Sequence, residues 1–177
     1  MYDTRVAPLT AEQTKAYRDM MNKLTIEAQE GSITAANEAV KAQKLIQVAC
    51  GCVYDGNGGE VVLDNTPRME TLMEVIEQAN TKVIVFVPFV SVAEKVAKEV
   101  SFNLDKANFT DGILHGRKFG TKVELIHGGV SKNERDRIFG AFQRSDEPRV
   151  LVAQPAAMSH GLTLTAASTI VWYAPIT

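Results

Sequence analysis

The fold is decided by the stretch from Arg149 to Thr177, RVLVAQPAAMSHGLTLTAASTIVWYAPIT. It contains two apolar runs, 149–153 and 169–173, of the kind that form buried strands in a parallel sheet covered on both faces. A polar turn that carries Gly161 lies between them. Because loops at the carboxyl ends of parallel strands face the ligand crevice, this order predicts an α/β fold with a binding loop after the first run.

Upstream of this stretch, strand and helix patterns alternate. The run 122–126 predicts a strand that ends at a His-Gly-Gly turn, and Ser131 forms a capping box with Glu134 at the start of a predicted helix. The run 82–88 predicts another strand, followed by a helix that Ser91 would cap. Together these elements favour βαβ units.

Two other segments are less regular. Residues 101–120 carry three glycines and three isolated phenylalanines, which predicts a long irregular excursion.

In the N-terminal third, Thr10 forms a capping box with Gln13 at the start of the first of two predicted helices. Residues 53–63 then predict a hairpin around a glycine-rich turn, which lacks the G-x-x-x-x-G-K-[ST] form of a phosphate loop.

Composition excludes several classes of protein. Hydrophobic residues at 45% and charged residues at 23% are ordinary values for a soluble globular chain of 177 residues. No apolar run is long enough to span a membrane, and no secretory signal follows Met1, so we expect a cytoplasmic protein. Cys50 and Cys52 fall short of any recognised zinc pattern, so we expect reduced thiols and no metal site.

The charge distribution leaves nucleic-acid binding open. A formal net charge of −2 argues against a broad basic face. Residues 115–149 nevertheless carry eight Lys or Arg against five acidic residues. This local excess fits a nucleic-acid contact or an ordinary solvated surface equally well.

Four segments in order resemble known motifs. Residues 83–89, VIVFVPF, are similar to the motif IV strand of superfamily-two helicases and translocases. The His-Gly-Gly turn with Glu134-Arg135 resembles their "HG…ER…F" segment, and 150–165 resembles their motif V. Residues 6–17 are similar to the segment that joins the two lobes of Swi/Snf ATPases.

Spacing within motif V favours the Swi/Snf branch. Six positions separate Gln154 from His160, as in the Swi/Snf pattern S-x-K-A-G-G-x-G-L-N-L, whereas DEAD-box proteins have five. Two departures are present: Met158-Ser159 stands where that pattern has Gly-Gly, and Thr163 stands where it has Asn.

The resemblance implies a domain organisation and a function. Residues 67–177 would form a RecA-like three-layer domain with a mostly parallel sheet, cut before the arginine motif Q-x-x-x-R-x-x-R, and residues 1–66 would form linker helices and a small hairpin. The chain would be the C-terminal lobe of an ATP-dependent DNA helicase or translocase of Swi/Snf type, from a bacterium or phage. It would pair with the N-terminal RecA-like lobe of the same protein and grip DNA, duplex rather than single-stranded, with RNA left open.

The resemblance also implies site residues. Those facing the ATP cleft would be His160, Gly161 and Thr163. Those contacting nucleic acid would be His127, Gly128, Gly129, Lys132, Arg135, Gln154 and Ser159. No catalytic residue is assigned within the chain, because ATP and Mg²⁺ would be bound mainly by the first lobe, so the chain alone is expected to be inactive.

Several site residues also have a plainer structural explanation. The His-Gly-Gly segment fits a tight strand-to-helix turn, Arg135 fits a salt bridge with its charged neighbours, and His160 fits a surface group. Trp172 is expected in the core rather than as a stacking platform. The rival functions are a free-standing nucleic-acid-binding or regulatory module without ATPase activity, and an unrelated α/β enzyme with a nucleotide-binding loop.

Overall fold

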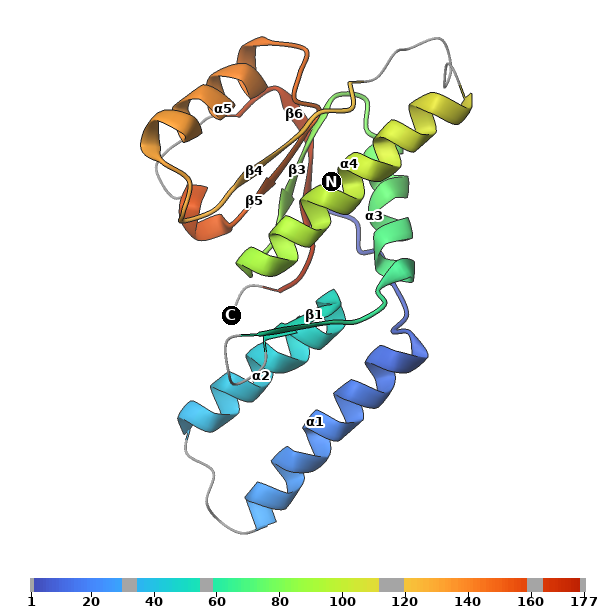
Figure 1. Ribbon diagram of the computed structural model, residues 1–177, viewed down its shortest axis with the longest axis vertical. Coiled ribbons are helices and arrows are strands. Elements are labelled where there is room, and N and C mark those ends of the chain that lie inside the picture. Colours follow the sequence, from blue (N-terminus) through green and yellow to red (C-terminus); the bar gives the residue numbers. More distant parts are fainter. Residues whose placement is uncertain (1, 30–34, 55–58, 112–119, 159–163, 176–177) are drawn as a thin grey trace. The chain divides into compact units, whose positions relative to one another are not determined.

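A computed structural model describes residues 2–29, 35–54, 59–111, 120–158 and 164–175 (Figure 1). The chain divides into two compact units. The first comprises Met1–Thr71 with the last three residues, and the second comprises Leu72–Ala174. Each unit has its own sheet.

The first unit contains two helices and a small antiparallel hairpin. Its elements are α1 (Ala11–Gln29), α2 (Ala35–Cys50), β1 (Cys52–Tyr54) and β2 (Glu60–Val62). The two helices and the pairing of the two strands were predicted from the sequence. The tip of the predicted hairpin, 55–58, lies outside the described residues.

Gln13 joins the two helices of this unit. The predicted capping box is present, because Thr10 N donates to Gln13 Oε1 at 3.0 Å and Gln13 N donates to Thr10 Oγ1 at 3.2 Å. Gln13 Nε2 also donates to the carbonyls of Val48 at 2.9 Å and Ala49 at 3.1 Å, near the end of α2. One buried side chain therefore satisfies backbone groups at two helix ends.

The second unit is a three-layer α/β sandwich. Its elements are α3 (Thr66–Gln78), which begins in the first unit, β3 (Lys82–Phe86), α4 (Val90–Asp111), β4 (Val123–Ile126), α5 (Lys132–Arg144), β5 (Val150–Ala153), the 3₁₀ turn η1 (Pro155–Met158) and β6 (Ala167–Trp172). The four strands are parallel in the order β4-β5-β3-β6. Helix α5 covers one face, and α3 and α4 lie on the other (Figure 1). This confirms the predicted RecA-like α/β class.

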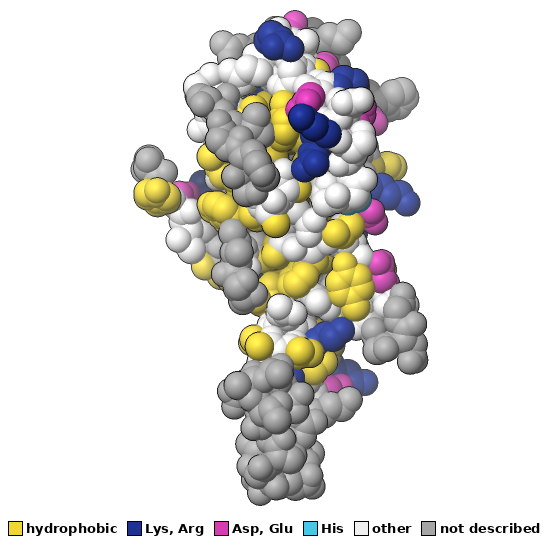
Figure 2. All heavy atoms as spheres, turned by 90° about the vertical axis from the view of Figure 1, so that its left-hand side faces the viewer, with side chains coloured by type: hydrophobic (Ala, Val, Ile, Leu, Met, Phe, Trp, Pro, Cys, Tyr) yellow, Lys and Arg dark blue, Asp and Glu magenta, His cyan; other side chains and the backbone are white. Residues whose placement is uncertain are grey.

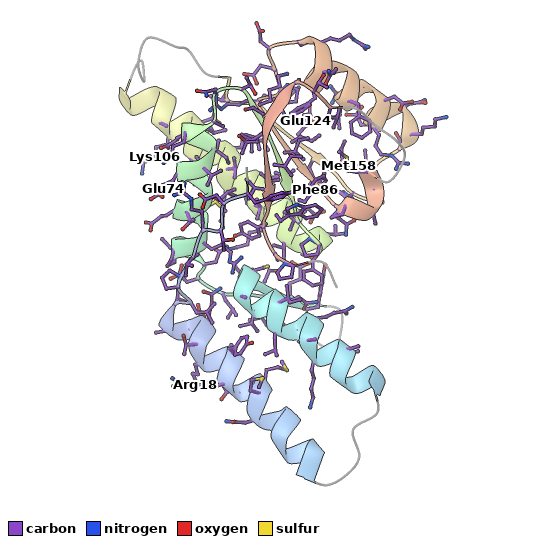
Figure 3. All side chains as sticks on the ribbon, turned by 180° about the vertical axis from the view of Figure 1, so that it is seen from behind. Arg18, Glu74, Phe86, Lys106, Glu124 and Met158 are labelled. Atoms are coloured by element: carbon purple, nitrogen blue, oxygen red, sulfur yellow. The ribbon has the colours of Figure 1, made fainter. Side chains whose placement is uncertain are left out.

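The two faces of the sheet have separate apolar layers. On the α5 face, Ile138 and Phe142 pack with Ile84, Ile126 and Leu151 of three strands. The valines that alternate with these residues therefore face α3 and α4, and Val83, Val85, Val150 and Val152 are all fully buried. Figure 3 shows Phe86 and Met158 on the α5 side, opposite Glu74 and Lys106 on α3 and α4.

Arg149 fastens the start of β5 to the end of α3. Its Nη2 donates to the carbonyls of Ile76 at 2.7 Å and Ala79 at 3.4 Å, which end the helix. Burial lowers the pKa of Arg149 from its ordinary value. A guanidinium placed at helix carbonyls is electrostatically favourable, so the basic residue before the strand has a structural role.

The predicted irregular segment 101–120 is wrong in its first half. Helix α4 continues to Asp111, because Leu104 extends the buried row formed by Val92, Val96 and Val100 by one more helical turn. Ser91 does not cap this helix, which already begins at Val90. No helix in the described part of the chain, α4 included, is long and apolar enough to cross a membrane.

The prediction that Trp172 belongs to the core is also wrong. Its side chain is 54% exposed and stacks on Phe86, with ring centroids 4.6 Å apart. Ile170, two residues earlier, is 57% exposed on the same face. Strand β6 lies at the edge of the sheet, and its residues alternate between half-buried and exposed.

Candidate nucleic-acid interface

The candidate site lies where β3, β4 and β5 end. Backbone hydrogen bonds hold these ends together: Val87 N donates to Ala153 O at 3.0 Å, and Gln154 N donates to Ile126 O at 2.8 Å. The segments that follow the three strands therefore begin side by side. In a parallel sheet this is the edge at which ligands bind.

The His-Gly-Gly turn after β4 is a compact loop with internal hydrogen bonds. Gly129 N donates to His127 Nδ1 at 3.1 Å, and Val130 N donates to His127 O at 3.0 Å. Because Nδ1 accepts in this bond, Nε2 is the ring nitrogen that can donate outward. The tight-turn explanation is correct, and it is compatible with a binding role.

The two glycines of this turn differ in the space around them. A Cβ added at Gly128 would have no heavy atom within 4 Å, so the loop surface is open there. A Cβ added at Gly129 would lie 2.9 Å from His127 Cε1 and would displace that ring. A side chain at Gly129 would therefore disturb the His127 ring, whereas the described residues impose no steric need for glycine at Gly128.

Helix α5 places two cations next to this turn. Ser131 caps the helix as predicted, with its Oγ accepting from Glu134 N at 3.3 Å. Lys132 and Arg135 follow at a spacing of three, which puts them on one helix face. Neither forms an ion pair with any residue that the structure describes.

The salt bridge with Glu134 is formed by Arg137, not by Arg135 as the plainer explanation of Arg135 had predicted. Arg137 Nη2 lies 2.6 Å from Glu134 Oε1 and 3.0 Å from Glu124 Oε1. The hydrogen bond from Arg137 lowers the pKa of Glu134, and both carboxylates raise the pKa of Arg137. Among the coloured residues of Figure 2, Lys and Arg lie beside Asp and Glu in this way, without one large basic area.

Gln154 lies between the turns that follow β3 and β4. Its Oε1 accepts from Gly128 N at 3.3 Å, and its Nε2 donates to Pro88 O at 3.1 Å. The sequence predicted Gln154 as a site residue but gave no indication of Pro88, whose backbone carbonyl is the acceptor. A backbone partner carries no signal in residue type, so only the sheet order could reveal it.

The other predicted site residues lie in a segment that the structure does not describe. Ser159, His160, Gly161 and Thr163 are outside the described residues. The described residues begin again at Leu164. Gln143 of α5 is bonded to the residues that follow, because its side chain donates to Thr165 Oγ1 at 2.6 Å and accepts from Ala166 N at 3.2 Å.

The predicted ATP cleft and the possibility of a metal site are separate questions. All three residues assigned to the ATP cleft belong to the segment just named. Within the described ranges, no group of three or more His, Cys, Asp or Glu side chains is placed to hold a metal ion.

Comparison with known proteins identifies the family. Residues 67–176 match the helicase conserved C-terminal domain, so the chain belongs to this family. The putative ATP-dependent helicase/translocase YwqA of Bacillus subtilis (strain 168) is 23% identical over 174 residues, which cover 94% of this chain. The chain spans 17% of the length of that protein.

Solved structures share the fold. The C-terminal domain of the Sulfolobus solfataricus SWI2/SNF2 ATPase matches with a TM-score of 0.72 and 23% identity, covering 96% of this chain and 70% of that one. The core of the same ATPase in complex with dsDNA matches with a TM-score of 0.69 and 22% identity, covering 94% and 33%. The chain is thus a helicase C-terminal domain with the RecA-like fold of Swi2/Snf2 ATPase C-terminal domains.

Proposed function

We propose that this chain is the second lobe of an ATP-dependent DNA translocase or helicase of Swi/Snf type. The lobe closes on an N-terminal RecA-like lobe to complete an ATP cleft, and it contacts the nucleic-acid backbone through the carboxyl edge of its sheet. ATP and Mg²⁺ are bound mainly by the other lobe. The family match and the resemblance in fold to an ATPase core in complex with dsDNA support this proposal.

One observation carries the nucleic-acid part of the proposal. The open surface at Gly128 and two cations without ion pairs among the described residues, Lys132 and Arg135, lie within eight consecutive residues at the ligand-facing edge. Cations and exposed backbone next to a loop suit phosphate groups, which position a protein without specifying sequence. Contact should therefore be electrostatic and independent of base sequence.

The test is a salt series of duplex-DNA binding, measured by fluorescence anisotropy. If Lys132 and Arg135 each neutralise one phosphate, the logarithmic salt slope should fall by roughly 1.8 in the double variant Lys132→Gln/Arg135→Gln. Between 50 and 200 mM salt, wild-type affinity should then drop about twelvefold more than that of the variant. The matched control is Lys98→Gln/Arg144→Gln, which removes the same charge from two exposed positions away from the edge.

The salt series distinguishes a specific contact of Lys132 and Arg135 with DNA phosphates from a general effect of the net charge of the chain. Equal slopes for the site variant and the control would refute the contact at the start of α5. Strong preference for one DNA sequence would favour the regulatory-module alternative. Gly128→Ala adds an independent test, because the methyl group fits the free protein and should weaken only DNA binding.

The same proposal predicts no ATP hydrolysis by this chain alone. Phosphoryl transfer in this fold needs a phosphate-loop lysine, an acidic residue for Mg²⁺ and arginines that stabilise charge on the transferred group. The sequence contains no G-x-x-x-x-G-K-[ST] motif. Phosphate release with Mg²⁺-ATP and duplex DNA that is lost on mutation within the chain would contradict the proposal.

A further inference from the structure

Gln154 occupies a central position at the carboxyl edge. Strand β5 lies between β4 and β3, and Gln154 is the first residue after it. Its backbone continues the pairing with β4, because Gln154 N donates to Ile126 O at 2.8 Å. Its side chain then reaches the turns that follow both neighbouring strands.

The two side-chain hydrogen bonds fix the orientation of the carboxamide. Oε1 faces the amide of Gly128 at 3.3 Å, and Nε2 faces the carbonyl of Pro88 at 3.1 Å. Reversing the carboxamide would set N–H against N–H and oxygen against oxygen. The group therefore works as a donor and an acceptor at once, between two segments that are 66 and 26 residues away in sequence.

The geometry points to Gln154 as a positioning residue that holds the turn at Gly128 at a fixed distance from the end of β3, and that acts on nucleic acid only through the position of this turn. This inference rests on the proposed function of the edge. The resemblance assigned Gln154 itself to the nucleic acid. In the structure, both polar ends of its side chain are bonded within the lobe.

Residue chemistry explains why this role suits glutamine. The Swi/Snf pattern has Ser at this position, whose single hydroxyl on a short side chain cannot reach two backbone groups on opposite neighbouring strands. Methionine has the length of glutamine but neither a strong donor nor a strong acceptor, and glutamate has two acceptors until it is protonated. Methionine and glutamate therefore supply the two variants for a test.

The first experiment follows backbone amides of the free chain by NMR. In Gln154→Met, hydrogen exchange of the Gly128 amide should accelerate about fivefold, the factor that corresponds to a net hydrogen bond of about 1 kcal/mol. Gln143→Met is the matched control, because it removes two comparable hydrogen bonds from another half-buried glutamine of the same unit. Unchanged exchange at Gly128 in Gln154→Met, or equal acceleration in the control, would overturn the inference.

The second experiment uses pH to restore one bond. In Gln154→Glu at neutral pH, a carboxylate oxygen can still accept from Gly128 N, but the other oxygen meets the Pro88 carbonyl without a proton. On acidification the protonated acid can donate to Pro88 O. The carbonyl ¹³C shift of Pro88 should then return towards the wild-type value with one titration midpoint, and wild type should show no such titration. A Pro88 shift in Gln154→Glu that does not depend on pH would overturn the inference, even if Gln154→Met does not fold.

A DNA titration separates this inference from the proposed function. The NMR signal of the Gly128 amide in the wild-type chain should shift when duplex DNA is added. Gln154→Met should reduce the affinity for duplex DNA. If the Gly128 signal does not move, the proposed DNA contact at this turn is refuted. The experiments on the free chain still decide whether Gln154 joins Gly128 to Pro88. If affinity drops in Gln154→Met although Gly128 exchange is unchanged, Gln154 contacts the DNA directly and the positioning role is refuted.

Discussion

Phe142 is expected to account for much of the attachment of α5 to the sheet, and Phe142→Ala should destabilise the second unit strongly. The side chain is fully buried among Ile84, Ile138 and Leu151. Truncating a buried phenylalanine costs about 3–5 kcal/mol, because both transfer free energy and contacts around the new cavity are lost. In a unit of roughly 100 residues this corresponds to a fall in Tm of at least about 12 °C.

The chain provides its own control for this experiment. Phe102 is also a helical phenylalanine, but it is 68% exposed, so Phe102→Ala should change stability by less than about 0.5 kcal/mol. Trp172 is the only tryptophan in the chain and belongs to the same unit, so its fluorescence during urea unfolding reports on this unit. A cost below about 1 kcal/mol for Phe142→Ala, or equal costs for both variants, would refute the packing argument.

Three further outcomes are expected. Gln13→Met should destabilise the first unit by about 2–3 kcal/mol in urea unfolding followed by circular dichroism, because one buried and two partly buried backbone groups lose their partner, whereas Gln43→Met at an exposed position of α2 should have little effect. Arg137→Met should raise the pKa of Glu134 towards 4.5 in an NMR titration of its carboxyl carbon, because the hydrogen bond from Arg137 lowers this pKa. The ion pair therefore stabilises the fold fully at pH values above the ordinary pKa of Glu134, and this contribution is lost as the pH falls through the lowered pKa. Burial raises the pKa of Cys50 to about 11, so only about one molecule in a thousand is ionised there at pH 8, and iodoacetamide should label this thiol only after unfolding; labelling of the folded chain at the unfolded rate would contradict this.

Most features that depend on neighbouring residues were predicted correctly, although the cap expected at Ser91 is absent. The capping box at Thr10 and the N-cap bond at Ser131 each join groups three residues apart, so the sequence contains both partners. The apolar runs that form β3 and β5 follow from residue type and length in the same way. The long helix α4 was only partly predicted, because Leu104 was not recognised as a member of its buried row.

The candidate site was predicted in part. The sequence indicated His127, Gly128 and Gln154, and the structure brings these three residues to one edge of the sheet. The sequence could not assign the partner of each charged residue. Arg137 rather than Arg135 binds Glu134, because Arg137 is also within reach of Glu124 on β4. That second carboxylate lies thirteen residues away in sequence.

The sequence by itself determined most of the helices and strands, except the second half of α4, and it determined that loops with polar and glycine residues follow the strands. The tertiary structure decided the strand order β4-β5-β3-β6, which makes β6 an edge strand and exposes Trp172. It also decided that Gln154 joins Gly128 to Pro88. Side-chain periodicity and helix capping act over a few residues, whereas these contacts exist only once distant strands have paired, so no local pattern specifies them.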